Sequence, residues 1–182
     1  MLRIILSYGT LAGLLIGIPT FGSFVLLGEN HPGGVAGMAL GYSIMLLGLS
    51  LVFLAIKRRR DELGGVIRFL PAFGLGLAIS LAASVFYVVA WEAAQAVTRI
   101  DYIGGYIQSA IAEKRAAGAS AAEIARFSAE MAAFKVQYAD PLFRIPMTLT
   151  EILPVGILVS LVSAGLLCNA RFLPSRAAPR AA

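Results

Sequence analysis

Three polar side chains share one face of a segment that is otherwise apolar. Arg144, Thr148 and Glu151 are spaced by four and then three residues, which places them on one face of an α-helix. At a rise of about 1.5 Å per residue, Arg144 lies about two turns from Glu151. A guanidinium and a carboxylate in this arrangement could pair with each other or bind an ion or a lipid headgroup.

A second carboxylate, Glu92, follows Trp91 at the end of another apolar run. In a structural interpretation, Arg144 or another helix donor pairs with Glu151, and Glu92 marks the membrane boundary. In a functional interpretation, a cation or proton binds between the two carboxylates, or a lipid headgroup binds with Arg144. We favour the structural ion pair and keep both open. The candidate binding residues are Glu92, Arg144, Thr148 and Glu151.

The chain lacks the sequence motifs of the common enzyme classes. It contains no hydrolase triad, metal-ligand cluster, P-loop or dinucleotide fingerprint. His31 is the only histidine and Cys168 the only cysteine, which excludes an intrachain disulfide and a cysteine metal cluster. We therefore expect a protein that is not an enzyme, with no catalytic residue, no metal site and no cofactor.

These polar residues lie in a chain composed like a membrane protein. The 182 residues are 59% hydrophobic and 14% charged, whereas about 25% of residues are charged in soluble domains. Four long runs contain no Lys, Arg, Asp or Glu, and roughly 20 apolar residues suffice to cross a bilayer as a helix. The sequence predicts an all-α membrane protein that forms a single domain over residues 1–182. We place its four transmembrane helices at about 4–28, 33–56, 69–95 and 143–168.

The first run could instead be a signal peptide, because Arg3 precedes it. It is longer than the usual signal core, and no small-x-small cleavage site closes it. We therefore favour a transmembrane helix.

The segment 98–140 differs from the rest because its positive and negative charges are balanced. Gly118 predicts the end of one helix, and Ser120-x-x-Glu123 is a capping box that predicts the start of the next. An apolar seam then recurs at intervals of three and four: Ile124, Phe127, Met131, Phe134 and Tyr138. We expect an extracytoplasmic helical hairpin. Its apolar faces could pack on each other, lie on lipid or bind a partner, and we favour mutual packing.

The basic residues predict the orientation of the chain. Lys57-Arg58-Arg59-Arg60 follows the second apolar run, and Arg68 precedes the third. Short basic loops stay in the cytoplasm, so this loop and both termini are expected there. The basic residues near the two termini support the same orientation: Arg3, Arg171, Arg176 and Arg180. The loop could also be an anionic-lipid patch. We expect no nucleic-acid partner.

Small residues recur at the spacing that lets membrane helices approach closely. Gly9, Gly13 and Gly17 repeat every four residues, as do Gly33, Gly37 and Gly41, and Gly156 with Ser160 marks a similar face. These faces could form a homodimer interface or pack the first two helices together. We favour packing of the first helix on the second, because their short connection makes them antiparallel neighbours.

Several short motifs together resemble a bacterial membrane-protein family known as domain of unknown function family 4199. They are Gly41-Tyr42, Phe53-x-x-Ile56-Lys57-x-x-Arg60-Asp61, Gly64-Gly65-Val66-Ile67-Arg68-Phe69, Tyr87, Trp91-Glu92, Pro141-x-x-Arg144 and Glu151-Ile152-x-Pro154-Val155-Gly156. The resemblance implies a four-helix bacterial membrane protein with an extended segment before the last helix, and hence the inner membrane. It implies no activity and no catalytic residues.

Two functions follow as expectations. The first is a non-enzymatic scaffold or accessory subunit in the lipid bilayer, which meets a membrane-protein partner or a second copy through the hairpin or the glycine faces. The alternative is a small transporter or an ion- or lipid-binding protein built around Glu92, Arg144 and Glu151.

Overall fold

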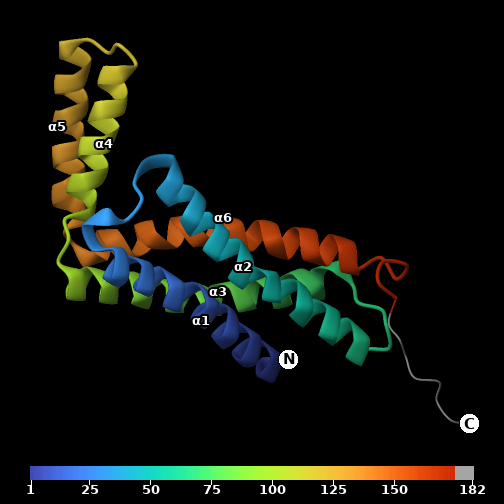
Figure 1. Ribbon diagram of the computed structural model, residues 1–182. Coiled ribbons are helices and arrows are strands. Elements are labelled where there is room, and N and C mark those ends of the chain that lie inside the picture. The colour runs from blue at the N-terminus through green and yellow to red at the C-terminus, as the bar shows by residue number, and fades with distance from the viewer. Residues whose placement is uncertain (175–182) are drawn as a thin grey trace, which may run out of the picture.

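The computed structural model describes residues 1–174, apart from the side chain of Glu29, and every regular element in this part of the chain is a helix (Figure 1). Arg176 and Arg180 lie outside the described residues. The helices are α1 (Leu2–Leu27), η1 (Gly28–Asn30), α2 (Gly34–Glu62), α3 (Phe69–Thr98), α4 (Tyr102–Ala116), α5 (Ala121–Tyr138) and α6 (Pro141–Leu167). Helices α1, α2, α3 and α6 are long and apolar enough to cross a membrane. For the described residues, the all-α fold and the four helices long and apolar enough to span a membrane are confirmed.

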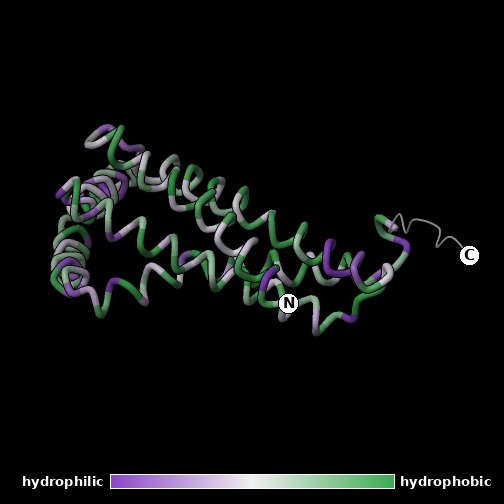
Figure 2. Tube along the Cα trace, turned by 90° about the horizontal axis from the view of Figure 1, so that it is seen from below, coloured by the Kyte–Doolittle hydropathy of each residue, from purple (hydrophilic) through white to green (hydrophobic). Residues whose placement is uncertain are grey.

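The four long helices form a bundle in which α3 packs between α1 and α6, and α2 contacts all three. Fully buried aliphatic side chains fill its centre: Ile16, Leu49, Val52, Ile56, Leu75, Ile79, Ile152 and Leu167. Many other large apolar side chains face outward, as expected where lipid is the solvent. Figure 2 shows hydrophobic residues along the bundle and hydrophilic ones gathered in the α4–α5 hairpin and near the opposite end.

The glycine face of α1 packs against α3. A Cβ added at Gly9 would lie 2.6 Å from the Cβ of Ala82, and one at Gly13 would lie 2.5 Å from the ring of Phe86. Such contacts need glycine because a larger side chain would separate the two backbones. Packing within the chain is confirmed, but the prediction that α2 is the partner helix was wrong.

The two other small-residue faces have different roles. A Cβ at Gly156 of α6 would lie 2.7 Å from the Cβ of Ser80 in α3, so these helices also approach closely. By contrast, a Cβ at Gly41 of α2 would meet nothing within 4 Å. The α6 face therefore packs inside the bundle, whereas Gly41 of α2 faces open space.

Helices α4 and α5 lie side by side and run crosswise to the bundle at one of its ends (Figure 1). The predicted capping box opens α5: Glu123 N–H donates to Ser120 Oγ over 3.3 Å, and Ser120 N–H donates to Glu123 Oε2 over 2.8 Å. The hydrogen bonds that Ser120 N–H and Ser120 Oγ donate to the Glu123 carboxylate lower the pKa of Glu123. At the base of the hairpin Lys135 pairs with Asp101 and lowers its pKa.

The apolar seam of α5 is partly buried, and the two hairpin helices contact each other as expected. Lys114 of α4 places its Nζ 4.8 Å from the ring centroid of Phe127 in α5, a geometry that favours cation–π attraction. Mutual packing of the hairpin is therefore confirmed.

The opposite end of the bundle is closed by Arg60, whose side chain is completely buried. Its guanidinium donates to the carbonyl of Phe172 over 2.8 Å, to that of Leu173, and to that of Leu167 over 3.5 Å. The last carbonyls of a helix lack partners within it, so a cation here satisfies them. The basic cluster is not a loop but the last turns of α2, and Arg60 links α2 to the end of α6.

We predict that Arg60→Met destabilises the protein by about 2 kcal/mol or more, because buried carbonyls lose a charged donor. Arg58→Met is the matched control: its side chain is 60% exposed and pairs with Glu62 on the surface, so it should cost less than about 1 kcal/mol. Thermal unfolding of both variants in the same detergent measures the difference. Equal losses would contradict the structural role of Arg60.

Candidate functional site

Arg144 pairs with Glu92 and not with Glu151. Its Nε donates to Glu92 Oε1 over 2.7 Å and its Nη2 to Glu92 Oε2 over 2.5 Å. This two-bond geometry is the strongest that Arg and a carboxylate form. Arg144 lies in the first turns of α6 and Glu92 near the end of the antiparallel α3, so the two meet at the same level of the bundle. The predicted Arg144–Glu151 ion pair was wrong.

Thr148 has a local role. Its side chain is 1% exposed, and its Oγ1 donates to the carbonyl of Arg144 one turn earlier over 3.0 Å. This hydrogen bond satisfies the hydroxyl within α6. Thr148 therefore lies on the predicted face, but its hydroxyl is already hydrogen-bonded to the helix backbone.

Glu151 has a separate environment, formed with α3. The hydroxyl of Tyr87 donates to its Oε2 over 2.8 Å. Its Oε1 accepts no hydrogen bond from residues 1–174. The surface of a cavity reaches this carboxylate, so the side chain is exposed there although helices surround it. The four predicted residues thus divide into a structural pair, a helix-bonded threonine and a carboxylate in a cavity.

This cavity has a volume of about 340 Å³ and lies at the hairpin end of the bundle. Its walls come from all six α-helices and from His31, which follows η1, and nine of the lining residues are aromatic: Phe24, His31, Tyr42, Tyr87, Trp91, Tyr102, Tyr106, Phe134 and Tyr138. Glu151 is the only acidic residue among the described residues that line it, and none of them is Lys or Arg. The described residues therefore place one carboxyl group in a cavity with aromatic walls.

The aromatic rings hold one another in place. Phe24 stacks on His31 with centroids 4.0 Å apart, and it meets the ring of Trp91 edge-on at 4.9 Å and that of Tyr102 at 5.4 Å. Trp91 Nε1 donates to the hydroxyl of Tyr138 over 3.0 Å. Edge-on and stacked pairs of this kind stabilise beyond simple burial. His31, the only histidine of the sequence, is part of this wall.

The hydroxyls contributed by the hairpin stay neutral. Burial raises the pKa of Tyr138 to about 12, although the hydrogen bond from Trp91 opposes the shift. Burial raises the pKa of Tyr102 as well, and the charge of Glu151 adds to the effect. Since both values lie above the ordinary phenol pKa of about 10, neither hydroxyl loses its proton near pH 7. Both hydroxyls can therefore donate hydrogen bonds into the cavity.

Sequence reasoning identified Glu151 but missed the aromatic wall. The wall residues come from all six α-helices and the turn at His31, and no single element places more than a few of them together. The available signal was that Trp91, Tyr87, Phe24 and Tyr102 all fall near the same predicted end of the bundle.

A family model described as "Protein of unknown function (DUF4199)" matches residues 7–169. The match covers all four long helices and the hairpin. No curated protein and no solved structure matches the chain.

We predict that Glu92→Gln and Arg144→Gln each lower the free energy of unfolding by about 1–3 kcal/mol, because each leaves a half-buried charge without its partner. Their side chains are only 27% and 14% exposed. The double variant should lose less than the sum of the two. Thermal unfolding measures this coupling.

Glu151→Gln is the matched control, because its amide oxygen can still accept from Tyr87 and no ion pair is lost. We expect its melting temperature to stay close to that of the native chain. Additive losses for Glu92 and Arg144 would refute a structural ion pair.

Proposed function

We propose a function from the cavity of this chain, which belongs to the DUF4199 family of proteins of unknown function. It is a non-enzymatic membrane protein that binds a small ligand at the hairpin end of its helix bundle. The observation that carries this proposal is the cavity of about 340 Å³ with aromatic walls and the carboxylate of Glu151. This is the ion- or lipid-binding alternative that the sequence left open.

The size and lining of the cavity fit a binding role. Small-molecule sites have volumes of about 300–1,000 Å³ and are mostly apolar, with a few polar groups that orient the ligand. Here the polar groups are the Glu151 carboxylate, the hairpin tyrosine hydroxyls, and Thr20 and Ser23 of α1. A transporter would need a second opening. The opposite end is closed by Arg60, so we favour binding.

The cavity opens between α2 and α6. Met38 and Tyr42 of α2 and Met147 of α6 line it and are 54%, 47% and 39% exposed. At the opposite end of the bundle α2 and α6 are joined, because Arg60 donates to the carbonyl of Leu167. An opening between two lipid-facing helices would admit a ligand sideways from the bilayer.

The scaffold or accessory role remains a second candidate with less support. The glycine face of α1 and the Gly156 face of α6 are used inside the bundle, so they are not free for a partner. The α4–α5 hairpin and the Gly41 face of α2 are the remaining surfaces for a membrane-protein partner or a second copy. No residue of α4 is buried, and Tyr138 is the only buried residue of α5.

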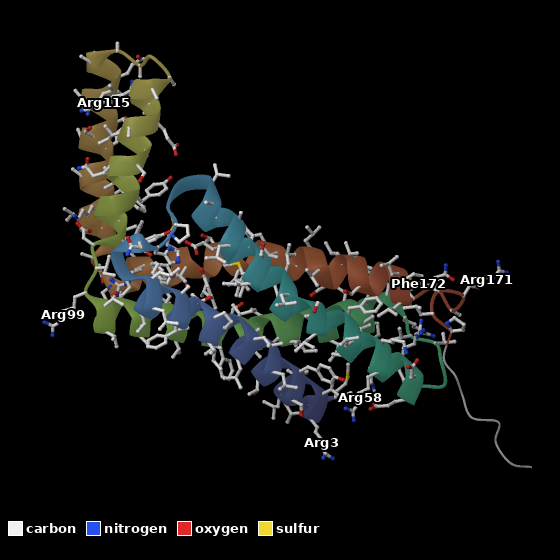
Figure 3. All side chains as sticks on the ribbon, viewed as in Figure 1. Arg3, Arg58, Arg99, Arg115, Arg171 and Phe172 are labelled. Carbon is white, nitrogen blue, oxygen red and sulfur yellow. The ribbon has the colours of Figure 1, made fainter. Side chains whose placement is uncertain are left out.

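We further propose that the hairpin lies outside the cytoplasm and that the N-terminus and the opposite end of the bundle lie inside it, in the inner membrane of a bacterium. Arg3, Arg58 and Arg171 are at the end away from the hairpin, whereas Arg99 and Arg115 are at the hairpin end (Figure 3). The end away from the hairpin holds more of the Lys and Arg residues, and such ends stay in the cytoplasm.

The orientation is tested with single cysteines introduced into Cys168→Ser. An impermeant maleimide should label Ala117→Cys, in the exposed hairpin turn, in intact spheroplasts. It should label Leu63→Cys, in the exposed α2–α3 connection, only after the membrane is disrupted. The reverse pattern would overturn the proposed orientation.

Ligand binding is tested through Trp91, the only tryptophan of the chain, which lines the cavity. In nanodiscs, 1-octanol or octyltrimethylammonium should change its fluorescence saturably. Gly41→Phe should remove that change by filling the cavity. Gly74→Phe is the matched control, because a Cβ at either glycine meets nothing within 4 Å but Gly74 does not line the cavity.

If neither amphiphile changes the Trp91 fluorescence saturably, the binding function is overturned. An equal loss of signal in Gly41→Phe and Gly74→Phe would overturn it as well, because the effect would then not come from the cavity.

A further inference from the structure

We propose that the ligand of this cavity is an organic ammonium cation, held by the Glu151 carboxylate and by aromatic ring faces. This inference rests on the proposed binding function and names its ligand class. It requires an unneutralised carboxylate, aromatic faces beside it, and a space that suits a bulky cation better than a bare ion.

Within residues 1–174, no Lys or Arg side chain pairs with the carboxylate of Glu151. Arg144 lies on the same face of α6 as Glu151, but its guanidinium is held by two hydrogen bonds to Glu92. The described residues around the cavity include neither Lys nor Arg. Tyr87 donates to one carboxylate oxygen, and the other oxygen accepts no hydrogen bond from residues 1–174. A negative charge among membrane helices is costly, so a bound cation would lower its energy.

The walls beside this carboxylate are suited to a cation. Ring faces of Trp, Tyr and Phe attract ammonium groups through their quadrupole, and quaternary ammonium ligands are often held in aromatic cages. Phe24, Trp91 and Tyr102 form a mutually packed wall with ring centroids 4.9–5.4 Å apart. Tyr87, one helical turn before Trp91 in α3, donates its hydroxyl to Glu151.

The donor set and the volume argue against a small inorganic cation. A calcium ion takes six to eight oxygen ligands, typically with several carboxylates, but Glu151 is the only carboxylate here. Within residues 1–174, no three His, Cys, Asp or Glu side chains are placed to hold a metal. About 340 Å³ also far exceeds one ion. An ammonium group that carries carbon substituents would use both the charge and the apolar walls.

The position of the opening indicates a lipid source for the ammonium group. The rim residues Met38 and Met147 are exposed apolar side chains of two membrane-spanning helices. A headgroup could enter between α2 and α6 at this end of the bundle while its acyl chains stay in the bilayer. The same pocket would accept a free amine, and the experiment separates the two sources.

The test compares cations with neutral molecules of similar shape, read by Trp91 fluorescence in phosphatidylglycerol nanodiscs. The pairs are choline with 3,3-dimethyl-1-butanol, in which carbon replaces nitrogen, and octyltrimethylammonium with 1-octanol. We expect the cation of a pair to bind about tenfold more tightly or better than its neutral partner. Glu151→Gln should remove this preference without weakening the neutral molecule. Glu130→Gln is the matched control, because Glu130 pairs with Arg126 on the hairpin surface.

A second variant tests the ring faces separately from the charge. Phe24→Leu keeps an apolar side chain but removes one aromatic face of the wall. It should weaken binding of the cation roughly 2- to 30-fold, the range that cation–π contacts supply, and leave the neutral molecule almost unchanged.

The outcomes separate this inference from the function on which it rests. If neutral molecules bind as tightly as the cations in both pairs, or if Glu151→Gln keeps the preference, the ammonium assignment is wrong and the binding function stands. If no probe of either pair binds, both fail. For the source, phosphatidylethanolamine added to the nanodiscs should compete with choline and weaken its apparent affinity several-fold. Unchanged choline affinity would assign the site to a free amine.

Discussion

The ion pair between Arg144 and Glu92 fixes the hairpin end of this bundle. It joins the end of α3 to the start of α6 through hydrogen bonds of 2.7 and 2.5 Å. The hairpin is inserted between these two helix ends, and the ion pair holds them together. The same pair commits the guanidinium that could otherwise have reached Glu151. Because a partly buried carboxylate without a basic partner is costly, pairing one of the two acids determines the environment of the other. Glu151 is left with Tyr87 and the cavity.

The bundle is closed at one end and open at the other, for reasons that lie in its side chains. Near the basic turns of α2, Leu49, Val52 and Ile56 fill the space between helices, and Arg60 binds the carbonyls at the end of α6. Toward the hairpin, Gly41 of α2 lines the cavity, and a Cβ added there would meet nothing within 4 Å. The hairpin tyrosines cover that space without occupying it. An internal volume at this end therefore follows from glycine on α2 as much as from the aromatic wall.

The sequence predicted features that depend on one helix and missed those that depend on two. Charge-free runs gave the four spans, the capping box gave the start of α5, and the 4–3 spacing placed Arg144, Thr148 and Glu151 correctly on one face. The partner of Arg144 could not be predicted this way. Arg144 could reach either Glu92 or Glu151, and the rotation of α3 against α6 determines that it pairs with Glu92. The same limit explains why the α1 glycines were assigned to α2, and why Arg60 was grouped with exposed cations.

A ligand in this cavity would be coupled to the arrangement of the hairpin on the bundle. Tyr102 begins α4, Tyr138 ends α5, and both line the same space as Trp91 and Glu151. The hydrogen bond from Trp91 to Tyr138 already joins the hairpin to α3 at this point. A ligand that contacts both walls binds only when they are close together, so it stabilises that arrangement by its own binding free energy. The hairpin is therefore part of the site, and within residues 1–174 it extends away from the bundle (Figure 1).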